Sequence, residues 1–197
     1  MMLVEQTPVP LAALPVAEFK DHLRLGTGFA DDGLQDAVLE TCLRGALGAL
    51  EARTGKAILQ RGFRWTLAAW RDLSAQVLPV APVAAITGLS ITDRDGGASV
   101  IDPGRYRLEV DLHRPRLVSV SLVLPTIPVG GAAEISFDAG FDVAWSGVPS
   151  DLAQAVLMLA ARFYEFRDGD AEMAIPQSVA MLSERYRVPR LFGGGRA

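Results

Sequence analysis

The sequence of 197 residues has few of the side chains on which most enzymes and metal sites depend. Its single cysteine, Cys42, excludes an intrachain disulfide, and its two histidines, His22 and His113, show no spacing typical of metal ligands. No G-x-G-x-x-G, P-loop or G-x-S-x-G pattern occurs, and the glycine run 193–195 neither follows a strand nor opens a helix. We therefore expect a protein that is not an enzyme and has no metal or cofactor, and we interpret Cys42 as a small buried hydrophobe.

Basic stretches are also missing. The formal net charge is −4, and the densest group of arginines is the small one formed by Arg185, Arg187 and Arg190. A protein that grips nucleic acid neutralises its phosphates with clustered Lys and Arg side chains. The composition therefore disfavours tight DNA binding, although DNA could pass such a protein without adhering to it.

Long apolar runs are absent as well. No window reaches about 18 uninterrupted apolar residues, so we expect no membrane span. The N-terminus carries Glu5 and lacks a basic segment followed by an apolar one, so we expect no signal peptide and synthesis in the cytoplasm. Half of the residues are nevertheless hydrophobic, which is typical of a globular chain and favours one that covers part of its surface in an assembly.

Two helices are predicted before residue 57. The segment 15–25 predicts a short helix, and Asp31 or Asp32 is a suitable N-cap for a longer one that ends at Gly55. The apolar positions of the longer helix cover a wider arc than a helix lying on one surface needs. This pattern favours a helix that is central to its own domain, and the alternative is a helix that also faces a neighbouring subunit. One stripe consists of Leu34, Val38, Cys42, Ala46 and Ala49, and a neighbouring stripe consists of Leu39, Leu43, Leu47 and Leu50.

The period of the apolar residues changes to two between about residues 58 and 137, which predicts antiparallel strands with one solvated face. Asp93 to Gly97 predicts a hairpin tip, because its glycines accept positive φ. A calcium loop is the weaker interpretation, because the remaining oxygen ligands and the closing Glu are missing.

Helical periodicity returns after Pro149. It predicts one helix up to about residue 167, with Phe163 and Tyr164 near its end, and a short one over 177–186. The order helices, strands, helices predicts an α+β fold in which the N- and C-terminal helices pack as a small bundle with an inserted antiparallel β domain. We expect residues 1–57 and 149–188 in the helical domain, 58–148 in the β domain, and 189–197 as an extended tail.

The C-terminal tail is apolar where no element is left to cover it. Val188, Pro189, Leu191 and Phe192 follow the last predicted helix, and a glycine run follows them. We expect the tail to dock on another chain, although docking on its own domain would cover the same residues.

Several short segments, in their order along the chain, resemble the head–tail connector, or adaptor, family of tailed bacteriophages and gene transfer agents. No single segment is specific, but together they extend over nearly the whole chain. They are His22-Leu23-Arg24-Leu25, the Asp31-Asp32 cap, Glu51-Ala52-Arg53-Thr54-Gly55-Lys56, Pro149-Ser150-Asp151-Leu152, Arg162-Phe163-Tyr164-Glu165-Phe166-Arg167 and Tyr186-Arg187-Val188-Pro189-Arg190.

The resemblance implies a structural role at the head–tail junction of a virion or gene-transfer-agent particle. Adaptor subunits form a homo-oligomeric ring, about twelve-fold, that docks on the portal, extends the DNA channel and carries a tail stopper or tail-completion protein. The C-terminal segment commonly reaches the portal, so we expect portal contacts from Arg187, Val188, Pro189, Arg190, Leu191 and Phe192. We expect contacts between ring subunits from Leu39, Leu43, Leu47 and Tyr164.

A second hypothesis concerns the β domain alone. Trp65, Trp70 and Trp145 could line a stacking platform for carbohydrate or another surface ligand, with the helices as a mount. Burial of these tryptophans would argue against that function.

Overall fold

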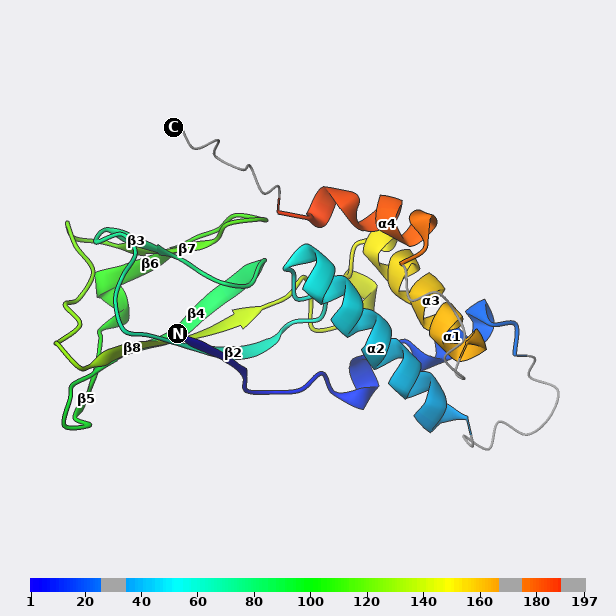
Figure 1. Cartoon of the computed structure of the whole chain (residues 1–197), viewed down its shortest axis with the longest axis horizontal. Helices are drawn as coiled ribbons and strands as arrows, with labels where there is room; N and C mark the ends of the chain where they lie inside the picture. The colour runs from blue at the N-terminus through cyan, green and yellow to red at the C-terminus, as the bar shows by residue number, and fades with distance from the viewer. Residues whose placement is uncertain (26–34, 167–174, 189–197) are drawn as a thin grey trace, which may run out of the picture.

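A computed structural model of the chain describes residues 1–25, 35–166 and 175–188. Helices gather at one end of an elongated molecule and strands at the other, as Figure 1 shows. The chain enters the helical end, leaves it for the strands and returns to it, so the predicted α+β fold with an inserted β domain is confirmed.

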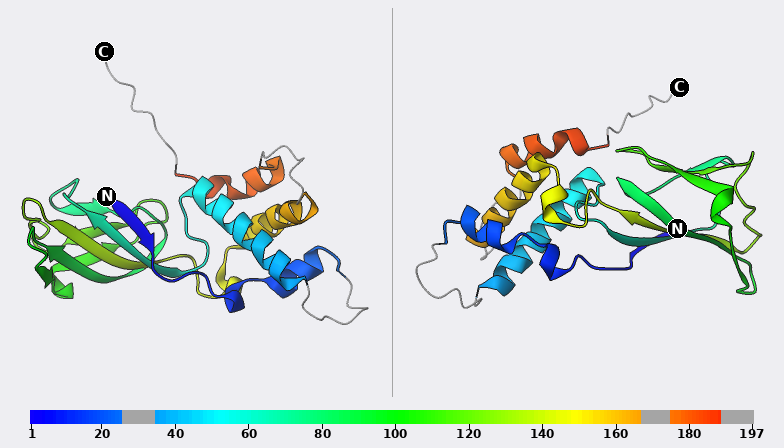
Figure 2. Two further views of the ribbon diagram at one scale, coloured as in Figure 1. Left: turned by 60° about the horizontal axis from the view of Figure 1, so that its bottom comes forward. Right: turned by 180° about the vertical axis from the view of Figure 1, so that it is seen from behind.

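Within the described residues, four α-helices form the helical domain, because each has an apolar side that the others cover. The long pair, α2 and α3, packs side by side, α4 lies along α3, and α1 contacts both long helices. Figure 2 shows this arrangement from two further sides. The helices are α1 (Val16–His22), α2 (Asp36–Thr54), α3 (Ser150–Glu165) and α4 (Gln177–Ser183), with short 3-10 turns at Leu11–Ala13, Trp145–Gly147 and Glu184–Tyr186.

The C-terminal end of α2 lies where the sequence predicts it, whereas the predicted caps of the N-terminal end lie outside the described residues. Gly55 closes the helix with φ of 70°, and its N–H donates to the carbonyl of Glu51 at 2.8 Å, as a left-handed glycine cap should. At the other end Gln35 occupies the N-cap position, while the predicted caps Asp31 and Asp32 lie outside the described residues.

Two antiparallel sheets form the β domain. The larger has the strand order β1-β2-β8-β4-β5 and the smaller β3-β7-β6, so neighbouring strands in space are often distant in sequence. The strands are β1 (Met2–Glu5), β2 (Arg61–Leu67), β3 (Ala75–Val77), β4 (Val83–Thr92), β5 (Ala98–Val100), β6 (Tyr106–Glu109), β7 (Arg116–Ser119) and β8 (Ala132–Ala139), with a 3-10 turn at Pro103–Arg105 before β6.

Each domain has its own core. The inner residues of β2 and β8 alternate with solvated ones and pack toward the smaller sheet, with Phe63 and Phe137 stacked at 5.7 Å between ring centroids. The helical core instead contains Phe19, the leucines of α2 and the apolar side of α3. The change of period read from the sequence therefore marks a change of core.

The N-terminal strand corrects the predicted domain boundary. Residues 1–57 were assigned to the helical domain, but β1 pairs with β2, matching Leu3 to Trp65 and Glu5 to Phe63. A four-residue strand in a proline-rich segment carries too little periodicity to reveal its distant partner. The chain therefore crosses between the domains three times, after β1, after α2 and after β8.

The described part of the chain contains no helix that is both long enough and apolar enough to cross a membrane.

A pair of glycine substitutions tests the packing where β8 ends. Gly140 has φ of 139°, and a Cβ there would lie 2.2 Å from Cα of Gln60, whereas a Cβ at Gly48 on α2 would meet nothing within 4 Å. Gly140→Ala should therefore lower the free energy of unfolding by at least about 2 kcal/mol. Gly48→Ala should raise it by roughly 0.5–1 kcal/mol, because alanine is the better helix former. Urea denaturation of both variants measures the two effects, and equal stability would contradict the backbone geometry described for Gly140.

Candidate assembly interfaces

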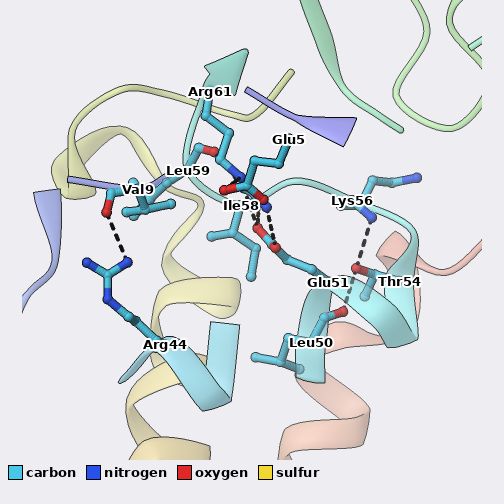
Figure 3. A network of polar contacts seen from close by, with 10 residues as sticks. All are labelled: Glu5, Val9, Arg44, Leu50, Glu51, Thr54, Lys56, Ile58, Leu59 and Arg61. Carbon is cyan, nitrogen blue, oxygen red and sulfur yellow. Dashed lines mark hydrogen bonds and ion pairs between the residues drawn. The ribbon is translucent and has the colours of Figure 1, made fainter. Parts of the chain in front are cut away.

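The junction between the domains is fastened by one ion-pair network. Glu51, in the last turns of α2, receives two hydrogen bonds from the Arg61 guanidinium of β2, at 2.9 and 2.8 Å (Figure 3). The same carboxylate accepts from the Ile58 N–H at 2.8 Å, and Glu5 of β1 lies 3.1 Å from Arg61 Nε. The Arg61 side chain is only 9% exposed and that of Glu51 17%, so this bidentate pair is largely withdrawn from water.

Lys56 follows the end of α2 and is buried at the same junction. The residue is 1% exposed, its backbone N–H donates to the Thr54 hydroxyl, and among the described residues its Nζ has no hydrogen-bond partner. Burial lowers the pKa of the Lys56 ammonium below its usual range, and the charge of Asp111 in the β6–β7 connection offsets part of that effect. We therefore expect the buried ammonium of Lys56 to lower the stability of the fold.

The histidines do not form a catalytic pair. His22 lies on α1 in the helical domain, whereas His113 lies in the β6–β7 connection of the β domain, where its backbone N–H donates to the Asp111 carboxylate at 2.7 Å. Within the part of the chain that the structure describes, no group of three His, Cys, Asp or Glu side chains could hold a metal ion.

The Asp93–Gly97 segment is a hairpin tip between β4 and β5. The Asp93 carboxylate accepts hydrogen bonds from the N–H groups of Asp95 and Gly97, at 2.9 and 2.7 Å. Asp93 is therefore occupied in closing the turn, as turn chemistry predicts.

The three tryptophans do not form a platform. Trp65 is buried in the β core, and Trp70 is half-buried there with its indole N–H donating to the carbonyl of Pro125 at 2.7 Å. Trp145 packs on the core of the other domain. The stacking surface required by the ligand-binding hypothesis is therefore not present.

The leucines predicted to contact a neighbouring subunit require a correction. Leu39 and Leu43 are 0% exposed and Leu47 is 5% exposed, all within the core of their own chain. They face α1 and α3, so α2 is the central helix of its own domain. Tyr164, by contrast, is half-buried on α3 and donates its hydroxyl to the Gln35 side chain at 3.1 Å.

An open apolar depression lies between the start of α2 and the end of α3. It has a volume of about 520 Å³ and is lined by Ala37, Val38, Thr41, Cys42 and Phe163. Cys42 is buried, as predicted, whereas Val38 and Thr41 are exposed. At this end of α2 the accessible apolar side chains are therefore those of Ala37 and Val38, and not those of the predicted leucines.

The last described residues lie on the surface. Arg187 is exposed and pairs with Glu184 at 2.8 Å, and Val188 is exposed beside it. The remaining predicted portal contacts, Pro189, Arg190, Leu191 and Phe192, lie outside the described residues. All three views place the exit of this segment close to the end of α2 and to the connection between β6 and β7.

Comparison with known proteins shows the family. No protein-family model and no curated protein matches the chain. A chain in the neck of an empty gene transfer agent particle, computed with C6 symmetry, is 52% identical, with a TM-score of 0.91 and coverage of 98% of this chain and 99% of that one. This chain belongs to the head–tail connector (adaptor) family.

Two further solved structures agree with this assignment of the connector. A chain in the virion of a native gene transfer agent particle is 52% identical with a TM-score of 0.88. A chain in the neck of a native particle, computed with C12 symmetry, is 48% identical with a TM-score of 0.86, and both matches cover 98% of this chain and 99% of the other. The connector is thus a structural protein of the neck, and its predicted location at the head–tail junction is confirmed.

The junction network should contribute strongly to the stability of the connector. Glu51→Ala would leave the Arg61 guanidinium buried without its bidentate partner, and we expect a loss of about 3 kcal/mol in the free energy of unfolding. Glu40 on the same helix is the matched control, because its ion pair with Arg44 is more exposed (30% and 39%). Glu40→Ala should cost no more than about 1 kcal/mol. Chemical denaturation measures the free energy of unfolding of both variants. Similar losses would show that the junction pair contributes no more to stability than an exposed ion pair does.

Replacing Lys56, whose Nζ has no hydrogen-bond partner among the described residues, should raise the free energy of unfolding. Lys56→Met keeps the length of the side chain and eliminates a buried ammonium, so we expect the connector to gain about 1 kcal/mol of stability. Lys20 is the control, because its Nζ lies 2.7 Å from the Asp36 carboxylate and Lys20→Met should give no gain. Thermal or urea unfolding checks both variants, and destabilisation by Lys56→Met would mean that the ammonium has a favourable contact in solution.

Proposed function

We propose that the chain is one subunit of a ring, about twelve-fold, that docks on the portal, extends the DNA channel and carries the next tail component. The observation that supports this most is the near full-length match, at 52% identity, to a chain in the neck of a gene transfer agent particle. The C6 and C12 symmetries of the matched necks fit a cyclic arrangement of identical copies.

The charge of the chain fits a channel through which DNA passes. Each subunit carries a net charge of −4, so twelve copies carry −48. Such a ring repels phosphate over the Debye length and does not hold the DNA. The ring therefore guides DNA without specific binding.

The C-terminal segment is the proposed contact with the portal. Arg187 and Val188 are exposed where the segment leaves the helical domain, and the apolar Val188 is 40% exposed. Residues Pro189, Arg190, Leu191 and Phe192 continue the same segment with one charge and three apolar side chains, which suits docking on an apolar groove.

The residues that we propose to contact a neighbouring ring subunit differ in part from those that the sequence predicts. Tyr164 remains a proposed contact, since its amphipathic ring is half-exposed near the end of α3. The exposed residues Val38 and Thr41 replace the three buried leucines as the part of α2 that a neighbour can reach.

A pair of truncations tests the portal contact. Deletion of residues 189–197 should abolish recruitment to purified portal, because it removes the apolar side chains of the tail. Deletion of residues 193–197 is the matched control, since it removes the glycines, Arg196 and Ala197 but keeps Leu191 and Phe192. We expect binding of the control to stay within about threefold of the full chain, since surface residues of this kind rarely carry binding energy.

The measurement is cosedimentation of each chain with portal, with particle mass read on the complexes. Normal binding by the 189–197 deletion would refute the tail assignment. Failure of the full-length chain to bind portal at all would refute the proposed function.

A further inference from the structure

The strand β1 leaves one edge of the larger sheet open. It pairs with β2 on one side, and among residues 1–25, 35–166 and 175–188 no strand pairs with its other side. β1, which starts at the N label in dark blue in Figure 1, is the end strand in the order of that sheet. Met2, Leu3 and Val4 are 63%, 40% and 41% exposed, so the strand also presents apolar side chains on both faces.

The register identifies the backbone groups that are free. Gln6 N–H donates to the carbonyl of Gly62 at 2.8 Å, so Gln6 and Gly62 form a hydrogen-bonded pair. Such pairs alternate along an antiparallel ladder, which makes Val4 with Arg64, and Met2 with Thr66, the next ones. The N–H and C=O groups of Leu3 and Glu5 therefore point away from β2, toward the open edge.

This edge carries only part of the usual protection against pairing, because β1 is short and Glu5 is its one charged residue. Natural edge strands are blunted by lysine, proline, bulges or inward charges. β1 has the sequence Met-Leu-Val-Glu, and its one charged residue, Glu5, already lies 3.1 Å from the Arg61 guanidinium. An apolar open edge of this kind is a template for another strand.

The opposite edge of the same sheet is open as well. The strand β5 pairs only with β4, all three of its residues are exposed, and Val100 is 81% exposed. Asp93 N–H donates to Gly97 C=O and Ile101 N–H to Leu89 C=O, both at 2.9 Å. The same alternation leaves the N–H and C=O groups of Ala98 and Val100 directed outward.

The open edges of β1 and β5 carry backbone groups that can pair with each other. Each offers two N–H and two C=O groups with a spacing of two residues, and four antiparallel steps separate β1 from β5, so the two strands run in the same direction. In a parallel pair, Leu3 would stand opposite Ser99, since both side chains lie on the inner face with Trp65 and Ile91. Val4 would then stand opposite Val100 on the outer face.

We propose that β1 of one copy pairs with β5 of the next copy, so that the larger sheets join around the ring. A cyclic ring requires contacts between two different surfaces of each subunit, and the two open edges of one sheet are such surfaces. A twelve-fold axis turns each copy by about 30° relative to its neighbour, so the two strands stay nearly parallel. This pairing rests on the proposed ring and covers Met2, Val4 and Val100, which the isolated chain leaves in water.

Proline at residue 3 tests the open edge. Leu3→Pro removes an outward N–H that β2 does not use, so the sheet within the chain is kept. Leu3→Ala is the matched control, because it shortens the side chain but keeps the N–H. With portal present, we expect Leu3→Pro to reduce the yield of complete rings at least about tenfold, with thermal unfolding and single-copy binding to portal unchanged. Leu3→Ala should stay within about threefold of the unaltered chain.

Crosslinking tests whether a second copy of this chain is the partner of β1. In a Cys42→Ala background, copies that carry both Leu3→Cys and Ser99→Cys should give a ladder of covalent multimers when portal-bound rings are treated with a short thiol-to-thiol crosslinker. Copies that carry either cysteine alone should give none.

Each result decides between the proposals. Rings of the unaltered chain on portal, combined with no ladder and with normal assembly of Leu3→Pro, would overturn the strand pairing and leave the proposed function intact. A crosslink from residue 3 to portal would overturn the choice of a sister copy as the occupant. No binding to portal by the unaltered chain would overturn the proposed function and the pairing that rests on it.

Discussion

The buried pair between Glu51 and Arg61 determines how the two halves of this connector subunit are held. The Glu51 carboxylate neutralises a guanidinium of the first long strand and accepts the Ile58 N–H where the chain turns out of α2. The Glu51–Arg61 pair therefore connects α2, the turn that follows it and β2. Glu5 connects the N-terminal strand to the same pair. A buried bidentate ion pair at the junction holds the two domains together more firmly than a flexible linker would.

Two small cores in one chain of 197 residues explain why the surface stays apolar. A core of about 100 residues buries a smaller fraction of its chain than a single larger core would, so each domain leaves aliphatic side chains in water. In this chain they gather at β1, at β5, around Val38 on α2 and at Val188. Their positions at opposite edges of the sheet and at the chain exit suit a subunit that has neighbours on two sides and a partner at one end.

The fold could be predicted from the sequence because the apolar period changes from 3.6 to 2 and back, with Gly55 and Pro149 near the changes. The leucine stripe of α2 was assigned to the wrong surface, because a side chain that faces its own α3 and one that faces a neighbouring copy have the same periodicity. β1 escaped prediction because its partner lies about 60 residues away and pairing of that kind leaves no local signal. The Glu51–Arg61 pair likewise depends on how α2 meets β2, which no spacing rule gives.

The placement of the β domain between α2 and α3 orders the events of synthesis. All eight strands have been synthesised once β8 is complete, whereas α3, the main packing partner of α2, follows later in the chain. Before α3 is made, the leucines of α2 lack the α3 side chains that belong to the same core. A polypeptide that ended after β8 would therefore contain every described strand of both sheets but would lack α3 and α4, which cover the leucines of α2.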